Sequence, residues 1–442
     1  MDRRRGWRSP SRWAARLAVA IALGLVGACS EPDPFSPPPP PSGVALVDGA
    51  VEWGGPAPSM AIVRWGRRPG VYECVAYPAA RDREDRLATT RHRVPLLSAA
   101  VGDTVYFQAI DVTASGHMTP AAEIRAVVSG AVSTGPRLRW TMIDVGFGDA
   151  HLLTMPGSGR RVLIDAGERR DAANVMGFLA AAGVGHLEVV LATHVHADHI
   201  GGMVGEPGAV DDGVLGAWSV GEYVEGPAPS GERAAHDELL ATIAARGLPR
   251  RFVSPGDTQA GNPALAWDPE VRVEALNAGG GRAIGGETES DWINNDSVVL
   301  RVGYGDVDLV LGGDAEAPVQ ARMLAAGRAL ESEVLKVHHH GVDDASEPAY
   351  LSAVRPRVGL IPIATEESFS GTLPAGVVLS RLRERAIDVY ASDRAEPLGL
   401  IPTPGVGYNV TVVTDGNSYE VRLERSASVH WPPEAAERRV VP

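Results

Sequence analysis

The segment at residues 193–202, which reads THVHADHIGG, constrains the fold of this chain more than any other segment. It follows an apolar run at 189–192 that is typical of a buried strand. Side chains two residues apart on an extended loop point to one side, so we expect His194 and His196 to bind one metal ion. Asp198 and His199, where the chain turns into a helix, are expected to bind a second ion close by. The pattern therefore predicts a metal centre at the end of a strand.

A second histidine cluster, His338, His339 and His340, follows another short apolar run and directly precedes a glycine. Between the two clusters, Asp314 ends an apolar run at 309–311. A carboxylate at that place can bridge two cations, and a further imidazole can complete the second ion's ligand set. Two adjacent cations would polarise an ester and lower the pKa of a water molecule. Asp314 also precedes a helical pattern, so capping of that helix is a simpler role for it.

HVHADH, with the later Gly-Asp and His-Gly elements, resembles the signature of the metallo-β-lactamase superfamily of αββα metallohydrolases. More narrowly, six segments are similar to the hydrolase domain of the ComEC family of DNA-uptake channel proteins. These segments read MIDVGFGDA, LIDAG, THVHADHIGG, NNDSVVLRV, LVLGGDA and VLKVHHHGVDDAS. The resemblance extends over most of residues 138–415. It implies an α/β fold, the αββα sandwich, at about 137–425, and a hydrolase that uses two divalent ions, zinc or manganese.

The resemblance also implies a role for each matching residue. The implied metal ligands are His194, His196, Asp198, His199, Asp314 and His339. Asp198 would in addition orient the nucleophilic water and so act in catalysis, while Asp149 and Asp165 would support the loops beneath the site. The ComEC-type motif ends in two histidines before the glycine, so His340 carries over as well, for metal or substrate. Lys336, the only lysine in the chain, stands beside these ligands.

Two departures from the wider superfamily concern the first ion and the substrate. Asn294 and Asn295 stand where the superfamily has a third histidine for the first ion, as they do in the ComEC type. An amide oxygen is a harder and weaker ligand than imidazole, which favours manganese over zinc there. His236, in a helical stretch, is the alternative third ligand. Residues 372–374 read Thr-Leu-Pro where the ComEC type often has Gly-His-Pro, so a histidine that would contact a phosphate is missing.

The N-terminus has the features of a bacterial lipoprotein signal. Six arginines precede an apolar run at 17–28, which is too short to anchor a chain across a bilayer. The run ends in Val-Gly-Ala before Cys29, which resembles a lipobox whose cysteine is acylated. We expect residues 1–28 to be the signal peptide of an exported, membrane-anchored lipoprotein facing the periplasm or the cell exterior. An ordinary signal peptide that contains a cysteine is the alternative.

The remaining segments predict a modular chain. Residues 29–42 are rich in proline and predict an extended tether. Residues 43–130 alternate apolar runs with Gly, Pro and Asp turns, which predicts a small all-β sandwich. Their sequence resembles a fibronectin type III domain. Residues 426–442 are polar and predict a flexible tail.

The charge of the chain bears on its partners. The 442 residues carry 41 basic and 55 acidic side chains, a net charge of −14. Within residues 137–425 the counts are 24 and 41. This excess of acid disfavours tight binding of nucleic acid, although the ComEC resemblance implies a phosphodiester substrate and even nuclease action. Hydrolysis of a small ester, lactone or amide remains an alternative, as does a non-catalytic metal-binding lipoprotein. The membrane is expected to be contacted through the lipid anchor alone.

Overall fold

The computed structural model describes residues 39–55, 58–79, 89–113, 117–130, 135–205, 212–227, 229–231, 233–364, 373–393 and 407–426. The predicted signal peptide, Cys29, most of the predicted tether, residue 372 and the tail beyond 426 lie outside these residues. The chain divides into two units, Met1–Ser36 and Pro37–Pro442, and all the described residues belong to the second. Among the described residues, no helix is both long enough and apolar enough to cross a membrane.

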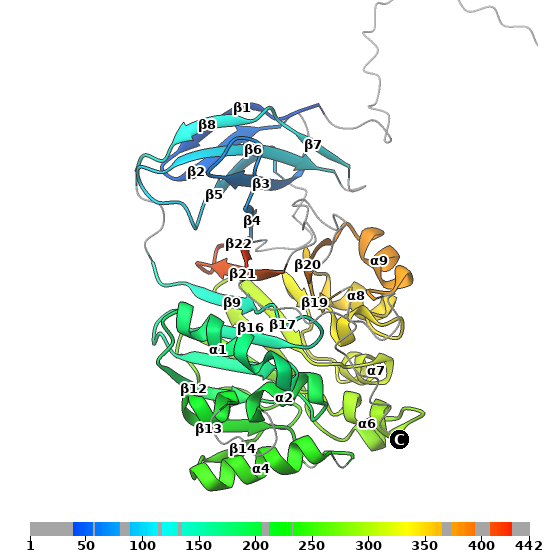
Figure 1. Ribbon diagram of the computed structural model, residues 1–442. Coiled ribbons are helices and arrows are strands. Elements are labelled where there is room, and N and C mark those ends of the chain that lie inside the picture. The colour runs from blue at the N-terminus through cyan, green and yellow to red at the C-terminus, as the bar shows by residue number, and fades with distance from the viewer. Residues whose placement is uncertain are drawn as a thin grey trace, which may run out of the picture. The chain divides into compact units, whose positions relative to one another are not determined.

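The N-terminal part of this unit consists of two β-sheets packed on each other (Figure 1). One sheet has three antiparallel strands, β1 (Ser42–Val47), β2 (Ala50–Gly54) and β5 (Arg91–Pro95). The strands of the other are β3 (Met60–Gly66), β4 (Cys74–Pro78), β6 (Thr104–Val112), β7 (Met118–Pro120) and β8 (Ile124–Val127). Strands with alternating apolar residues bury one face, and here Trp53, Trp65 and Phe107 fill the space between the sheets.

The second of these sheets continues into the hydrolase part. Strand β4 pairs with the C-terminal strand β22 (Ser418–Arg425), and β22 pairs with β21 (Tyr408–Thr414). The further strands, in spatial order, are β9 (Leu138–Met142), β10 (Ala150–Thr154), β11 (Arg161–Ala166), β12 (His186–Leu191), β13 (Ser219–Glu225) and β14 (Arg250–Phe252). From β11 to β14 the strands run parallel. This long sheet is called the first sheet below.

A second, six-stranded sheet packs against the first. Its strands, in spatial order, are β15 (Val271–Asn277), β16 (Val299–Tyr304), β17 (Val307–Gly312), β18 (Val334–Lys336), β19 (Val358–Ala364) and β20 (Asp388–Asp393). The large apolar side chains of Trp140, Trp267 and Tyr419 are buried between the two sheets. The strands from β17 to β20 are parallel, and β17, β18 and β19 are buried on both faces, as expected for a sheet that is covered on both sides.

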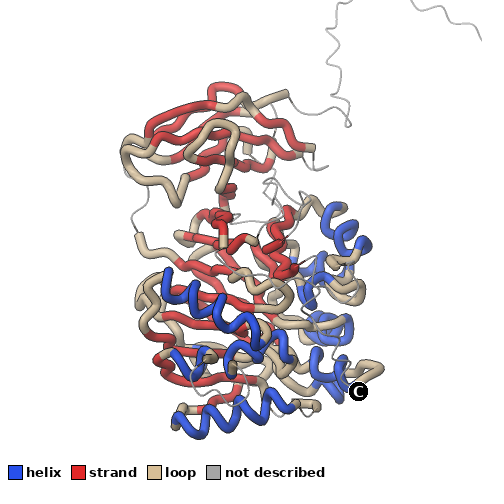
Figure 2. The backbone as a smooth tube through the Cα atoms, in the orientation of Figure 1, coloured by secondary structure: helices blue, strands red, loops and turns tan. Residues whose placement is uncertain are grey.

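Helices cover the outer face of each sheet, which gives the four layers seen in Figure 2. Those on the first sheet are α1 (Ala172–Ala181), α2 (Ala197–Val204), α3 (Val214–Ala217) and α4 (Ala234–Arg246). Those on the second are α5 (Gly281–Ile284), α6 (Glu289–Asn295), α7 (Ala317–Ala325), α8 (Pro348–Val354) and α9 (Gly376–Arg383). The expected α/β fold class, the αββα sandwich, is confirmed.

Side chains also join the N-terminal strands to the hydrolase sheets. Tyr77 of β4 stacks on Tyr419 with ring centroids 5.0 Å apart, and its hydroxyl donates to Asp388 at 2.8 Å. The Trp65 indole donates to Glu420 at 2.9 Å. The sequence predicts a self-contained sandwich at 43–130, whereas the structure contains a sheet that runs through both parts. The fibronectin type III assignment and the boundary at 130–137 stay predictions.

Candidate metal centre

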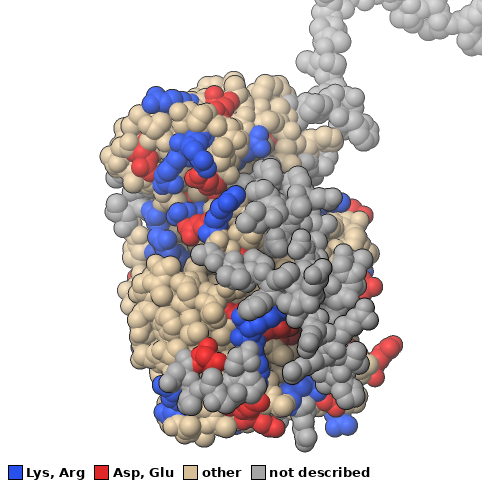
Figure 3. Space-filling model, viewed as in Figure 1, with Lys and Arg blue, Asp and Glu red and all other residues tan. Residues whose placement is uncertain are grey.

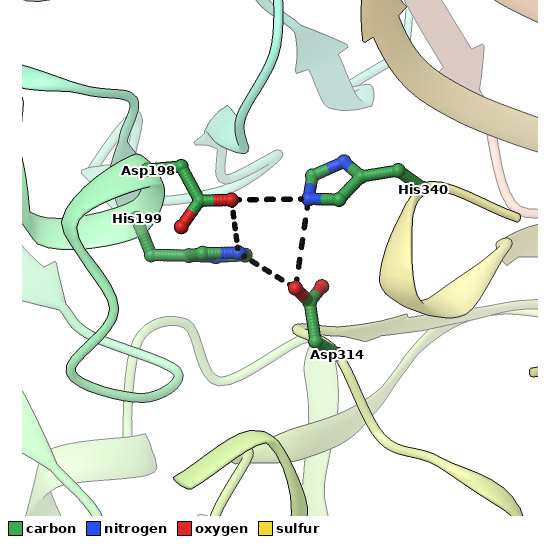
Figure 4. Close-up of side chains that lie close together, drawn as sticks. All are labelled: Asp198, His199, Asp314 and His340. Carbon is green, nitrogen blue, oxygen red and sulfur yellow. Dashed lines mark hydrogen bonds and ion pairs between the residues drawn. The ribbon is translucent and has the colours of Figure 1, made fainter. Parts of the chain in front are cut away.

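The predicted ligands lie where strands of both sheets end. Residues 193–196 follow β12 and lead into α2, which carries Asp198 and His199. Asp314 follows β17, and His340 lies in the short 3-10 helix η4 (His338–Gly341) after β18. Asp198, His199, Asp314 and His340 each place a ligand atom within 4.8 Å of the others (Figure 4). Segments far apart in the sequence thus form one cluster.

The distances within this cluster suit a single cation. His199 Nε2 lies 3.1 Å from Asp314 Oδ2 and 3.7 Å from Asp198 Oδ2. His340 Nε2 lies 3.4 Å from Asp198 Oδ2 and 3.5 Å from Asp314 Oδ2. Figure 4 shows both imidazole nitrogens facing the two carboxylates. Two nitrogens and two oxygens that converge on one point form a ligand set typical of divalent transition metals.

A second group of ligands meets the first at Asp314. His194 Nε2 lies 3.2 Å from His196 Nδ1 and 3.9 Å from Asp314 Oδ2. Burial lowers the pKa of both His194 and His196, so both rings are neutral and able to bind a metal. Asp314 Oδ2 is therefore close to both groups, which suits the bridging position that the sequence predicts for it.

Unsatisfied buried atoms provide an independent test of whether a metal fits. Among the described residues, His340 Nε2 and Asn294 Oδ1 are buried without a hydrogen-bond partner. Such atoms are rare because burial without a partner costs free energy. Burial lowers the pKa of His340, but Asp314 and Asp198 outweigh it and raise that pKa to about 10. The carboxylates here thus require positive charge, and divalent ions bound by these residues would supply it.

Asp165 holds the His199 ring in place. Its Oδ2 lies 2.8 Å from His199 Nδ1, which leaves Nε2 for the cluster. The Thr193 backbone N–H and hydroxyl both donate to Asp165, at 2.8 and 2.6 Å. Burial lowers the pKa of His199, yet Asp314, Asp198 and Asp165 together hold it well above its usual value. Asp165 lies beneath the site and binds the loop that carries the ligands.

Lys336 and Asp149 form a buried ion pair behind Asp314. The Lys336 Nζ lies 2.6 Å from Asp149 Oδ2 and 3.4 Å from Asp314 Oδ1, and it donates to the Gly313 carbonyl at 3.0 Å. The Lys336 side chain is 0% exposed, so it cannot reach a substrate. Although burial lowers its pKa, Asp149 and Asp314 raise it above the usual value. Lys336 therefore supports the cluster as a fixed positive charge.

The resemblance implies His339 as a ligand, but the structure places His340 in the cluster and closer to Asp314. His339 and His340 both have positive φ, 49° and 51°, in a tight turn whose geometry sequence spacing does not reveal. His339 lies at the rim, with its side chain 22% exposed and its Nε2 3.9 Å from Asp314. His338 points away from the cluster and lies 2.9 Å from the Tyr350 hydroxyl.

The structure also separates the three alternatives for a third ligand of the first ion. His236 lies on α4 and pairs with Glu225 at 3.0 Å, so it is not placed among the ligands. Asn295 has partners for both ends of its amide, since Nδ2 donates to the Gly285 carbonyl and Oδ1 accepts from the Glu316 backbone. Asn294 is the one whose oxygen is left without a partner among the described residues.

Glu316 is a residue that the sequence analysis missed. Its carboxylate accepts from Asn294 Nδ2 at 2.8 Å and from Asn295 Nδ2 at 3.2 Å. Because Glu316 accepts a hydrogen bond from the Asn294 amide nitrogen, it fixes the orientation of the Asn294 Oδ1. Burial raises the pKa of Glu316 to about 7. The signal in the sequence is its place two residues after Asp314, in the segment GGDAE.

Comparisons with known proteins agree with this architecture. Residues 143–364 match the family model of the metallo-beta-lactamase superfamily. ComE operon protein 3 of Bacillus subtilis (strain 168) is 24% identical over 271 residues, which are 57% of this chain and 31% of that protein. The chain thus spans about a third of the length of this curated relative.

Two solved structures show lower similarity. A diphosphatase from the PhnP family is 11% identical with a TM-score of 0.30, over 51% of this chain and 85% of that one. The metallo-β-lactamase MIM-1 from Novosphingobium pentaromativorans is 12% identical with a TM-score of 0.29, over 57% and 92%. The family model, by contrast, covers half of the chain. This protein belongs to the metallo-β-lactamase superfamily and is a hydrolase of that fold.

Proposed function

We propose that this protein is a phosphodiesterase that uses two divalent ions, manganese or zinc. The observation that carries the proposal is the position of Asp314 Oδ2, which lies in the cluster of Asp198, His199 and His340 and also 3.9 Å from His194 Nε2. Two buried atoms near it, His340 Nε2 and Asn294 Oδ1, lack hydrogen-bond partners among the described residues. One group would consist of His194, His196 and Asn294, and the other of Asp198, His199 and His340. The motif similarity to ComEC-type hydrolase domains supports a phosphodiester as the bond that is cleaved.

Bound divalent ions would supply a water molecule of lowered pKa and an electrophile for the ester oxygen. The chain's own contribution centres on Asp198, whose side chain is 18% exposed while that of Asp165 is fully buried. Burial raises the pKa of Asp198, but His199 and His340 outweigh it and hold that pKa well below its usual value. An ionised and partly accessible carboxylate accepts a hydrogen bond from water and so orients it toward a substrate.

Acidic residues at the rim favour a small substrate. Asp291, Asp343 and Asp344 lie close enough for their charges to interact, and Asp344 Oδ1 lies 3.9 Å from His339 Nδ1. These three residues are called the acidic rim below. A long polyanion would be repelled by it, particularly in a chain of net charge −14. The rim is the observation that favours the second candidate, an esterase, lactonase or amidase for small neutral substrates.

A metal and substrate panel distinguishes the two candidates. Metal content of the purified chain would be measured before and after chelation, and Mn²⁺ or Zn²⁺ would then be added back. We expect the apo protein to be inactive and the reloaded protein to cleave bis(p-nitrophenyl) phosphate faster than p-nitrophenyl butyrate or a simple lactone. Faster cleavage of the carboxylic ester or the lactone would establish the second candidate instead. Binding of metal with no turnover of any of these substrates would contradict both.

We also propose that the chain is exported and acylated at Cys29. The support is the basic segment, the apolar run at 17–28 and the small residues before the cysteine. In detergent phase partitioning the full-length protein should enter the detergent phase. The Cys29→Ser variant should move to the aqueous phase, whereas Cys74→Ser, which removes the other cysteine, should not. Unchanged partitioning of Cys29→Ser would overturn the proposal.

A further inference from the structure

A cavity of about 730 Å³ lies on the outer face of the first sheet, away from the metal centre. Its floor is the surface of β9, β10, β21 and β22, and its wall is the side of α1. Arg139, Arg161, Arg422 and Arg425 line it, together with Glu424. These five residues define the arginine groove. None of the predicted metal ligands lines the cavity.

Strand alternation explains why the arginines gather here. In β9, Leu138, Trp140 and Met142 point into the core between the sheets, so Arg139 points to the outer face. In β22, Val421 and Leu423 point into the same core, so Arg422 points outward as well. The nearby wall of α1 presents small residues, among them Ala173 and Gly177, which leave the space open.

The groove has an excess of positive charge in an acidic protein. Four guanidinium groups line it with a single carboxylate, that of Glu424, which lies 2.9 Å from Arg422. Arg139 lies on the outer face of β9, and no hydrogen bond or ion pair of its side chain is found within the described part of the chain, although Glu424 is near enough to interact with its charge. Partial burial of its guanidinium group and the like charges of Arg137, Arg422 and Arg161 lower its pKa, while Glu424 acts in the opposite direction. Figure 3 shows basic side chains gathered where Figure 1 draws β21 and β22.

We propose that the arginine groove is a binding site for a compact ligand that carries two or more phosphate groups. Guanidinium groups bind phosphate oxygens in pairs of parallel hydrogen bonds, and several together select a ligand of high negative charge. The cavity has the size of a small-molecule site. Thr141, Thr411 and Asn409 add polar side chains to its floor, while Leu152 and Phe178 provide apolar contacts for an organic part of the ligand.

Calorimetric titration of the full chain tests this site. The protein would be kept in chelator, so that phosphate cannot be held by metal ions. Inorganic tripolyphosphate and ATP would be compared with sulfate, and ATP should bind more tightly than tripolyphosphate if the apolar contacts contribute. We expect saturable binding of the polyphosphates that weakens with salt, and much weaker binding of sulfate.

Three variants of single charges make the test specific. Arg139→Ala, which removes a side chain without a hydrogen-bond or ion-pair partner among the described residues, should weaken tripolyphosphate binding about tenfold or more. Glu424→Gln removes the one carboxylate of the groove and should tighten binding severalfold. Arg383→Ala, at an exposed arginine on α9, is the matched control and should leave binding unchanged.

The opposite results would overturn the proposal. Absence of saturable binding at low salt would do so, as would equal weakening by Arg139→Ala and Arg383→Ala. His194→Ala provides a further check, because loss of binding in that variant alone would place the phosphate at the metal centre. The proposed site does not rest on the proposed hydrolase substrate. Binding in the groove and turnover at the metal centre are measured separately, so either can fail without the other.

Discussion

Two buried His–Asp clusters in this chain differ in whether their polar atoms are satisfied. In the N-terminal sheets, Ser59 Oγ lies 2.9 Å from both His92 Nε2 and Asp111 Oδ1, and the Trp53 indole donates to the same oxygen at 2.9 Å. We call these four residues the sandwich network. They include the Ser, His and Asp of a hydrolytic triad, but one imidazole nitrogen faces both partners, whereas a triad histidine uses one nitrogen for each.

The metal centre also brings histidine and aspartate side chains together, but some of its buried polar atoms lack hydrogen-bond partners in the described part of the chain. Its imidazoles and carboxylates converge, yet buried ligand atoms are left without hydrogen-bond partners within the described residues. Proximity of histidine and aspartate therefore does not by itself indicate a metal-binding or catalytic site. Unsatisfied buried atoms that face one point indicate a missing partner, while a satisfied network indicates structure.

We expect the largest loss of catalytic activity on replacement of Asp198. Replacing it by asparagine keeps the size of the side chain but removes the charge that orients water. We expect kcat/KM on the confirmed substrate to fall at least about a thousandfold, which is about 4 kcal/mol of barrier. His92→Gln, in the sandwich network, is the control and should keep normal turnover. Near-normal turnover of Asp198→Asn, in protein with full metal content, would refute the proposed role.

Glu316→Gln should have the next largest effect. The glutamine amide cannot accept from both asparagines as the carboxylate does, so Asn294 loses its fixed orientation. Replacing a residue that hydrogen-bonds to a metal ligand typically lowers metal affinity by about 10- to 100-fold. We therefore expect the first ion to bind at least about tenfold more weakly. Metal titration of the apo protein measures this directly. The exposed Glu331→Gln serves as the control, and equal affinities in the two variants would show that Glu316 does not act on Asn294.

A smaller effect, on stability alone, is expected at Ser59. Ser59→Ala removes a hydroxyl between two buried groups, which should lower the free energy of unfolding by about 1–3 kcal/mol. Urea unfolding measures the loss, and turnover should remain within about twofold of the parent. If turnover instead falls sharply while stability is kept, the sandwich network has a chemical role, and satisfied hydrogen bonds do not mark a purely structural cluster.

The smallest effect concerns pH. Burial lowers the pKa of His92 below its usual value of 6.5, although Asp111 acts in the opposite direction. Below pH 6.5 the unfolded chain therefore takes up a proton at His92 that the folded chain does not, and the free energy of unfolding falls. His92→Gln should show a shallower decrease than the parent as the pH is lowered. Identical slopes would contradict the assignment, because the contributions of the other histidines cancel in the difference.

The sequence was sufficient to predict the αββα fold and most of the residues that converge at the cluster, because the motifs fall at the ends of strands. The resemblance named His339 as the ligand, whereas His340 is the one that lies in the cluster, since the choice depends on a turn with two left-handed residues. The sequence analysis also missed Glu316, whose role appears only when α7 is placed against Asn294. The pairing of β4 with β22 joins strands that lie more than 300 residues apart in the sequence, and local patterns carry no information about it.

The only lysine of the chain lies within the hydrolase core, so cleavage at this residue can measure how often that core opens. An endoprotease specific for lysine has one peptide bond to cut in this sequence, after Lys336, which would separate the chain up to residue 336 from the part that follows. Because that side chain is fully buried between Asp149 and Asp314, cleavage requires the second sheet to open. The yield of the two fragments would therefore report the opening of the catalytic core alone, without any label and without interference from the N-terminal sheets.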